Sequence, residues 1–152
     1  ITKNEVNDLV YFLEDDYIHK NNAITEMLLT YEKLASQLDK ELFLCPADYP
    51  YLYSKIEDSK IFIGNKRHWR TTKETLITFF TSKKMILKYW EDLKSMSTLR
   101  HHPMEKKLHN IYKKEYCLSP IPSLAMHCTN INSIYGIPPN FEWKKIWDEN
   151  KI

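Results

Sequence analysis

Glycine is scarce in this chain, and its scarcity limits the folds open to the sequence more than any other feature does. Only two glycines occur in 152 residues, whereas aromatic residues make up 13% of the chain. Tight β-hairpin turns need positive φ angles, which glycine adopts more readily than any other residue. The sequence therefore favours helices joined by proline-containing loops over a fold rich in hairpins.

Apolar residues recur three or four positions apart in the first third of the chain, as they do on one face of a helix. One stripe predicts a helix over residues 3–20, beginning at the capping-box pair Thr2 and Glu5. A second stripe, from Ile24 to Leu42, predicts another helix. The asparagines between the two stripes predict a turn, so the two helices are expected to be antiparallel neighbours.

The same periodicity predicts further helices in the rest of the chain. The capping-box pair Thr71 and Glu74 opens a long helical pattern that reaches Leu93, and Thr81 and Ser82 are expected to kink or restart that helix. Later apolar stripes predict helices over 104–112 and 124–135, and a short helix after Asn140. Together these patterns predict a mainly α protein, an irregular bundle of about six helices.

Residues 43–70 differ from the predicted helices. Their prolines and tyrosines predict a loop region, with a short helix at 51–57 and an extended piece at 60–64. No shift in composition marks a boundary, so residues 1–152 are expected to form one helical domain. Because the chain begins with isoleucine, it is expected to be a fragment of a longer protein.

Composition excludes several classes of protein. Hydrophobic residues make up 43% and charged residues 28% of the chain, which excludes a disordered or fibrous protein. Cys45, Cys117 and Cys128 are odd in number and widely spaced, so they do not indicate a disulfide framework, and an intracellular location, cytoplasmic or nuclear, is predicted. No apolar run is long enough to span a membrane, and no cofactor is predicted.

Charge is distributed unevenly along the chain. Residues 1–59 have a net charge of −7, and residues 60–88 have a net charge of +7. Cations that can neutralise phosphates, around a tryptophan that can stack on a base, suggest a nucleic-acid-binding or anion-binding surface. Its candidate residues are Lys66, Arg67, Trp69, Arg70, Lys73, Lys83, Lys84 and Lys88. The alternative is that these cations are solvated and face the acidic first third of the same chain.

The leading functional hypothesis is a non-enzymatic interaction module that binds a protein partner. Its partner surface would be the basic segment 60–88, the aromatic C-terminal helix, or both. Trp143 and Trp147 lie one helical turn apart in that helix, and tryptophan is enriched at interface hot spots. The oligomeric state is left open by the sequence.

A third hypothesis is a metal-dependent hydrolase. Its candidate ligands are His101, His102, Glu105 and His109, because Glu105 and His109 share a helix face and a preceding histidine can fold over the helix start. The spacing matches no zincin motif, and Pro103 interrupts the helical geometry. No metal ligand is therefore assigned, and no catalytic residue either.

Two smaller groups of chemically active residues are expected to have structural roles. Asp15 and Asp16 lie within helical reach of His19, and paired carboxylates can act in acid–base chemistry or hold a divalent ion. On the predicted helix, however, they fall on the solvated side. His127 and Cys128 are adjacent, so on a helix they would point about 100° apart, which does not suit a shared metal.

Overall fold

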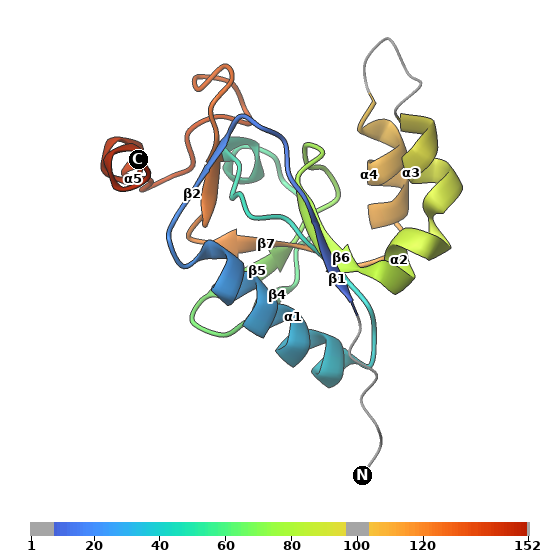
Figure 1. Cartoon of the computed structure of the whole chain (residues 1–152). Coiled ribbons are helices and arrows are strands. Elements are labelled where there is room, and N and C mark those ends of the chain that lie inside the picture. The colour runs from blue at the N-terminus through green and yellow to red at the C-terminus, as the bar shows by residue number, and fades with distance from the viewer. Residues whose placement is uncertain (1–7, 97–103, 152) are drawn as a thin grey trace.

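The protein has a mixed α/β fold, as the computed structural model of residues 8–96 and 104–151 shows (Figure 1). A six-stranded sheet lies between helices, and a two-stranded sheet stands beside it. The predicted mainly α bundle is therefore wrong. Among the described residues, no helix is both long enough and apolar enough to cross a membrane.

One of the two central strands of the large sheet comes from late in the sequence. Its order is β1-β6-β3-β7-β5-β4, and β3 and β7 run parallel whereas the other neighbours are antiparallel. The strands are β1 (Leu9–Phe12), β3 (Phe43–Leu44), β4 (Ile61–Ile63), β5 (His68–Thr71), β6 (Phe79–Ser82) and β7 (Cys117–Ile121). Because β7 lies between β3 and β5, it joins the two halves of the sheet.

The small sheet pairs β2 (Tyr17–His19) with β8 (Ala125–His127) in antiparallel register. The backbone that follows β3 connects the small sheet to the large sheet. The Pro46 carbonyl accepts hydrogen bonds from the N–H groups of Leu124 and Ala125, at 2.9 and 3.1 Å. The Asp48 N–H donates to the Ser123 hydroxyl at 2.8 Å. The two sheets are therefore held together by buried hydrogen bonds.

Helix α1 (Ala23–Leu38) covers one face of the large sheet and confirms the helix predicted there (Figure 1). Met27, Tyr31 and Leu34 are buried on its inner side. They pack in one cluster with side chains of β3, β5 and β7, namely Leu44, Trp69 and Leu118. The amphipathic pattern of this segment thus reflects a helix that packs on a sheet, not on another helix.

The opposite face of the sheet is covered by α2 (Lys83–Lys88), α3 (Trp90–Met96) and α4 (Lys106–Tyr112). Leu108, Ile111 and Tyr112 of α4 pack with Phe43 and Phe79 of the sheet. A 3₁₀ helix, η1 (Pro50–Tyr53), lies where a short helix was predicted, and β4 confirms the predicted extended piece. The final helix, α5 (Trp143–Glu149), confirms the predicted C-terminal helix and packs against the small sheet through Ile146.

The helix predicted over residues 3–20 is wrong, because β1 and β2 occupy its described part. The apolar spacing that suggested a helix lies in a run of aliphatic and aromatic residues that also suits a buried strand. In that run Leu9 and Tyr11 face the α1 side of the sheet, whereas Val10 faces the other side. This alternation is the period of a strand.

Two further predicted helices are also wrong. The segment from Thr71 to Leu93 holds the end of β5, then β6, α2 and the start of α3. Ser82 ends β6 and is the N-cap of α2, where its hydroxyl accepts a hydrogen bond from the Met85 N–H at 3.2 Å. The helix predicted over 124–135 is replaced by β8 and a series of turns.

The scarcity of glycine did not exclude sheets, because the β4–β5 hairpin turns without a positive φ angle and the residues that do have one lie at the end of α1 and in loops. Asp39, Asn130 and Asn140 have φ angles of 49°, 53° and 57°, and neither glycine is in this region. Asparagine and aspartate tolerate the left-handed region because their short polar side chains can form local hydrogen bonds. A shortage of glycine therefore did not prevent the chain from forming sheets.

Candidate functional site

The basic segment is divided between the interior and the surface. Trp69 of β5 is fully buried, with 0% of its surface exposed, so its ring has no face open to a base. Arg70 is buried and forms an ion pair with the buried Asp48, and its guanidinium lies 4.2 Å from the centre of the Tyr53 ring. Two of the candidate nucleic-acid contacts are thus part of the core.

The turn between β4 and β5 is held by Glu26, an α1 carboxylate that is 2% exposed. Glu26 accepts hydrogen bonds from the Lys66 N–H and the Asn65 side-chain amide, both at 2.9 Å. Arg67 approaches the same carboxylate at 3.9 Å and donates to the Pro122 carbonyl at 2.6 Å. This basic turn therefore packs against the acidic first third of the chain.

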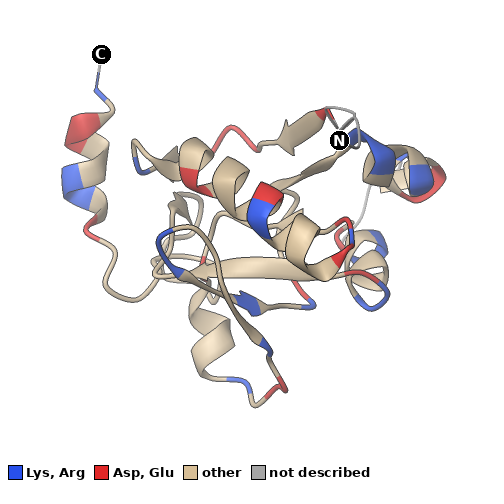
Figure 2. Cartoon of the chain, turned by 90° about the horizontal axis from the view of Figure 1, so that it is seen from below, with Lys and Arg blue, Asp and Glu red and all other residues tan. Residues whose placement is uncertain are grey.

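The exposed lysines of the segment do not gather on one face. Lys66 lies on the β4–β5 turn, at one side of the large sheet, and Lys83, Lys84 and Lys88 lie on α2, which follows β6 near the other side. Figure 2 shows basic and acidic positions interspersed over the chain. Lys83 and Lys88 form ion pairs with Asp8 and Glu115, at 3.2 and 2.6 Å. Lys73 is exposed in the segment after β5. Nucleic-acid binding by these residues remains a prediction.

The two C-terminal tryptophans of α5 differ in exposure. Trp143 is partly buried against the cluster formed by Met126, Phe141 and Ile146. Trp147 is 50% exposed. Contact with a protein partner through these tryptophans also remains a prediction.

The histidine and glutamate cluster proposed as a metal site is only partly within the described residues. His101 and His102 lie outside them. The Nε2 atom of His109 lies 2.8 Å from the Thr75 carbonyl oxygen, and Glu105 stands just before the first residue of α4. In the described parts of the chain, no group of three or more His, Cys, Asp or Glu side chains has the geometry of a metal site.

A different pair of residues meets at the end of the small sheet. β1 leads into the acidic turn Glu14–Asp16, which is followed directly by β2. The antiparallel register places Tyr17 opposite His127, and the Cys128 N–H donates to the Asp16 carbonyl at 2.7 Å. The Asp16 carboxylate and the His127 imidazole consequently lie side by side, with Nε2 and Oδ2 2.8 Å apart.

Each member of this pair keeps one polar atom without a partner. Oδ1 of Asp16 and Nδ1 of His127 are buried and have no hydrogen-bond partner among the described residues. The side chains themselves are 29% and 14% exposed. Buried polar atoms are normally paired, because leaving one unpaired costs about 1–3 kcal/mol. The fold therefore leaves one hydrogen-bonding atom of each residue in this pair without a partner among the described residues.

Glu14 provides a second carboxylate next to this pair. Its backbone N–H donates to the Thr78 hydroxyl at 3.0 Å, and that hydroxyl donates to its carboxylate at 3.2 Å. Burial raises the pKa of Glu14 above its ordinary value, the Thr78 hydrogen bond opposes the rise, and the nearby Asp16 carboxylate adds to it. The site thus combines two carboxylates and an imidazole.

A neutral polar core lies behind the pair. The Tyr17 and Tyr49 hydroxyls are 2.6 Å apart, and the Cys45 thiol lies 3.7 Å from the Tyr49 oxygen. Burial raises the pKa of Cys45 to about 12 and raises the pKa of Tyr17 as well. A thiol that stays protonated is a poor nucleophile, so Cys45 is a packing residue.

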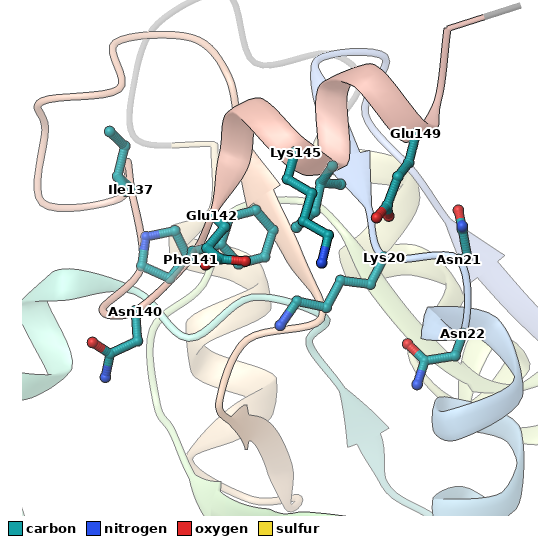
Figure 3. A pocket seen from close by; sticks show the side chains of 11 residues that line it. Lys20, Asn21, Asn22, Ile137, Asn140, Phe141, Glu142, Lys145 and Glu149 are labelled. Carbon is teal, nitrogen blue, oxygen red and sulfur yellow. The ribbon is translucent and has the colours of Figure 1, made fainter.

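A separate groove of about 740 Å³ lies between α5 and the residues just before α1. In Figure 3 the side chains of Lys20 and Lys145 point into it, beside Phe141. Glu142 and Glu149 also line the groove. The four charges offset one another, so the groove does not favour a ligand of either sign.

Sequence reasoning considered Asp16 and His127 separately and missed the pair. It placed both residues on helices, Asp16 beside His19 and His127 beside Cys128. The signal that indicates the site is an apolar run of strand-forming residues that ends in an acidic turn. Asp16 follows β1 and His127 ends β8. Which strand ends lie together can be inferred only when the pairing of the strands is known.

Comparisons with protein families, with curated proteins and with solved structures gave no match for this chain. A functional assignment therefore rests on the geometry and chemistry of the Asp16–His127 pair.

Proposed function

We propose that the chain binds a divalent metal ion that Asp16 and His127 coordinate together. The observation that carries the proposal is the 2.8 Å approach of Asp16 Oδ2 to His127 Nε2 beside two buried atoms that lack partners. Neighbouring ligand atoms around one metal ion lie about this far apart, because metal–ligand distances of about 2.0–2.2 Å at right angles give close to 3 Å.

Two protein ligands are enough for a site of this kind. Mg²⁺ and similar ions are commonly held by one or two carboxylates, keep several water molecules, and take further oxygen ligands from a bound phosphate. The imidazole of His127 extends the choice to Mn²⁺ and Zn²⁺, which accept nitrogen more readily. Glu14 adds a further carboxylate that interacts electrostatically with Asp16 and His127.

The metal proposal is tested with Mn²⁺ alone, by isothermal titration calorimetry and by the thermal midpoint of unfolding. The full chain is expected to bind Mn²⁺, and its midpoint is expected to rise with Mn²⁺ concentration because the ion binds only the folded state. Asp16→Asn and His127→Gln remove one ligand each and are each expected to weaken binding at least ~10-fold.

Asp15→Asn is the matched control. Asp15 lies in the same turn but is exposed, and its loss changes the local charge by the same amount as Asp16→Asn. It is expected to leave Mn²⁺ affinity within about twofold of the original, since surface charges contribute little. Equal effects of Asp15→Asn and Asp16→Asn would show a diffuse attraction to acidic residues and reject a defined site.

A further inference from the structure

A cleft of about 310 Å³ lies at the end of the large sheet where β4 begins and β5 ends. Strand β5 is antiparallel to both of its neighbours, so the first residues of β4 and of β7 lie beside the last residues of β5. Three segments that are distant in the sequence therefore meet here and line the cleft, namely 57–60, 71–73 and 112–117. The cleft is large enough for a small molecule, because such sites begin at about 300 Å³.

Backbone hydrogen bonds hold the walls of this cleft. The Lys60 N–H donates to the Thr71 hydroxyl at 3.0 Å, and the Lys60 carbonyl accepts from the Thr71 N–H at 2.9 Å. The Thr72 N–H donates to the Cys117 carbonyl at 2.9 Å. Thr72, Cys117 and Tyr112, which also line the cleft, are buried. The shape of the cleft is thus fixed by the fold, which lowers the cost of ordering it around a ligand.

Four lysines line the cleft, and none of them forms an ion pair with a described residue. They are Lys60, Lys73, Lys113 and Lys114. The Lys60 ammonium donates to the Tyr116 hydroxyl at 3.2 Å, and the Lys113 ammonium donates to the Asn110 side-chain oxygen at 3.1 Å. Both acceptors are neutral, so these hydrogen bonds leave the positive charge uncompensated.

The carboxylates of the cleft do not balance these lysines, because most of them are already paired elsewhere. Glu57 forms an ion pair with Lys55 at 3.0 Å, and Glu115 forms one with Lys88 at 2.6 Å. Asp58 is the only lining carboxylate without an ion pair to a described residue. The cleft therefore has an excess of unpaired positive charge. A cleft lined by charge of one sign concentrates its field and attracts ions of the opposite sign.

The donors of the cleft suit a phosphate group better than a carboxylate. The Thr71 hydroxyl accepts from the Lys60 N–H, and its own proton has no acceptor among the described residues. Lys40, whose ammonium lies 5.8 Å from the centre of the Tyr116 ring, adds a further positive charge beside the cleft. A phosphate group carries up to two negative charges and three acceptor oxygens, whereas a carboxylate carries one charge on two oxygens. A phosphate group therefore engages more of these donors.

We propose that this cleft binds a small ligand that carries phosphate groups, with Lys60, Lys73 and Lys114 as its counter-charges. Asp16 and His127 do not line the cleft. The proposal is consequently independent of the metal site, and either one can fail without the other.

The experiment is isothermal titration calorimetry of the full chain with inorganic pyrophosphate, at low ionic strength and with EDTA present to remove metal ions. The chain is expected to bind pyrophosphate. Lys73→Gln and Lys114→Gln are each expected to raise the dissociation constant about fivefold, the upper end of what one exposed charge pair contributes. Both side chains are exposed and make no ion pair with a described residue, so both variants are expected to fold.

Lys66→Gln is the matched control, because it removes the same charge from an exposed lysine. Lys66 lies on the β4–β5 turn, at the opposite end of these two strands. It is expected to leave the dissociation constant within about twofold of the original. Asp16→Asn, which removes a proposed metal ligand, is expected to leave pyrophosphate affinity unchanged in the same assay.

Malonate tests the choice of phosphate, because it is a small dianion whose charges are on carboxylates. It is expected to bind at least about fivefold more weakly than pyrophosphate. Three results would overturn the proposal: no binding of pyrophosphate at low ionic strength, an equal loss of affinity in Lys66→Gln and Lys73→Gln, or malonate binding as tight as that of pyrophosphate.

Discussion

Glu26 explains why the basic turn between β4 and β5 has its observed position. Its buried carboxylate accepts hydrogen bonds from the Lys66 N–H and the Asn65 amide. Glu26→Ala leaves both donors unpaired, so it is expected to lower the free energy of unfolding by about 1.5–3 kcal/mol. Chemical denaturation measures this change. Glu32→Ala, an exposed change on the same helix, is expected to stay within about 0.5 kcal/mol of the original.

His19 makes stability depend on pH in a defined direction. Burial lowers the pKa of His19 below its ordinary value of 6.5, and the Tyr11 hydroxyl lies 2.5 Å from its Nε2 atom. The folded chain therefore favours neutral His19, whereas the unfolded chain takes up a proton first as the pH falls. Stability is expected to fall as the pH drops below about 6.5, by at most ~1.4 kcal/mol per pH unit from this residue.

Denaturation curves at pH 5, 6 and 7 test the role of His19. In His19→Gln the dependence of unfolding free energy on pH is expected to be shallower than in the original chain. An unchanged slope would assign the dependence to another group.

At the scale of elements, the hairpin of β4 and β5 depends on Gly64. A Cβ atom at this position would lie 2.4 Å from the Trp69 ring and 2.7 Å from the Thr30 hydroxyl. Gly64→Ala is therefore expected to destabilise the protein by about 1–3 kcal/mol through overpacking. Thermal and chemical unfolding measure the loss. Lys66→Ala, in the same turn but exposed, serves as the control and is expected to be nearly neutral.

The helices were predicted correctly where the apolar pattern fits only the period of a helix. The prediction was wrong where the same apolar residues fit both a helix and a strand. α1 and α5 were predicted because their polar and apolar residues alternate at helical spacing alone. β1 and β6 were missed because short apolar runs fit a strand and a buried helix equally well, and packing between elements decides the outcome. Ser82 was expected to kink or restart a helix, and it is the N-cap of α2.

The candidate site was less predictable than the elements. Asp16 and His127 are far apart in the chain, and only the pairing of β2 with β8 brings them together. A single sequence carries no signal for that pairing, because register depends on which strands meet. The basic segment shows the opposite problem, since Trp69 and Arg70 look like a binding surface in sequence yet are buried.

At the scale of the whole molecule, the two sheets are expected to unfold together. The hydrogen bonds that the Leu124 N–H donates to the Pro46 carbonyl and the Asp48 N–H donates to the Ser123 hydroxyl are buried between them. Denaturation followed by far-UV circular dichroism and by tryptophan fluorescence is therefore expected to give one coincident transition. Separate midpoints would show that the small sheet with α5 unfolds independently of the large sheet.

The central position of β7 has a consequence for how the chain matures on the ribosome. β3 touches β7 only after Cys117–Ile121 has been synthesised, and β5 with β4 joins the rest of the sheet through the same strand. Until then the nascent polypeptide carries β1, β3 and β6 as a partial sheet with an uncovered central edge. Premature termination upstream of Cys117 would thus release a product prone to aggregate, whereas loss of α5 alone would leave the large sheet complete.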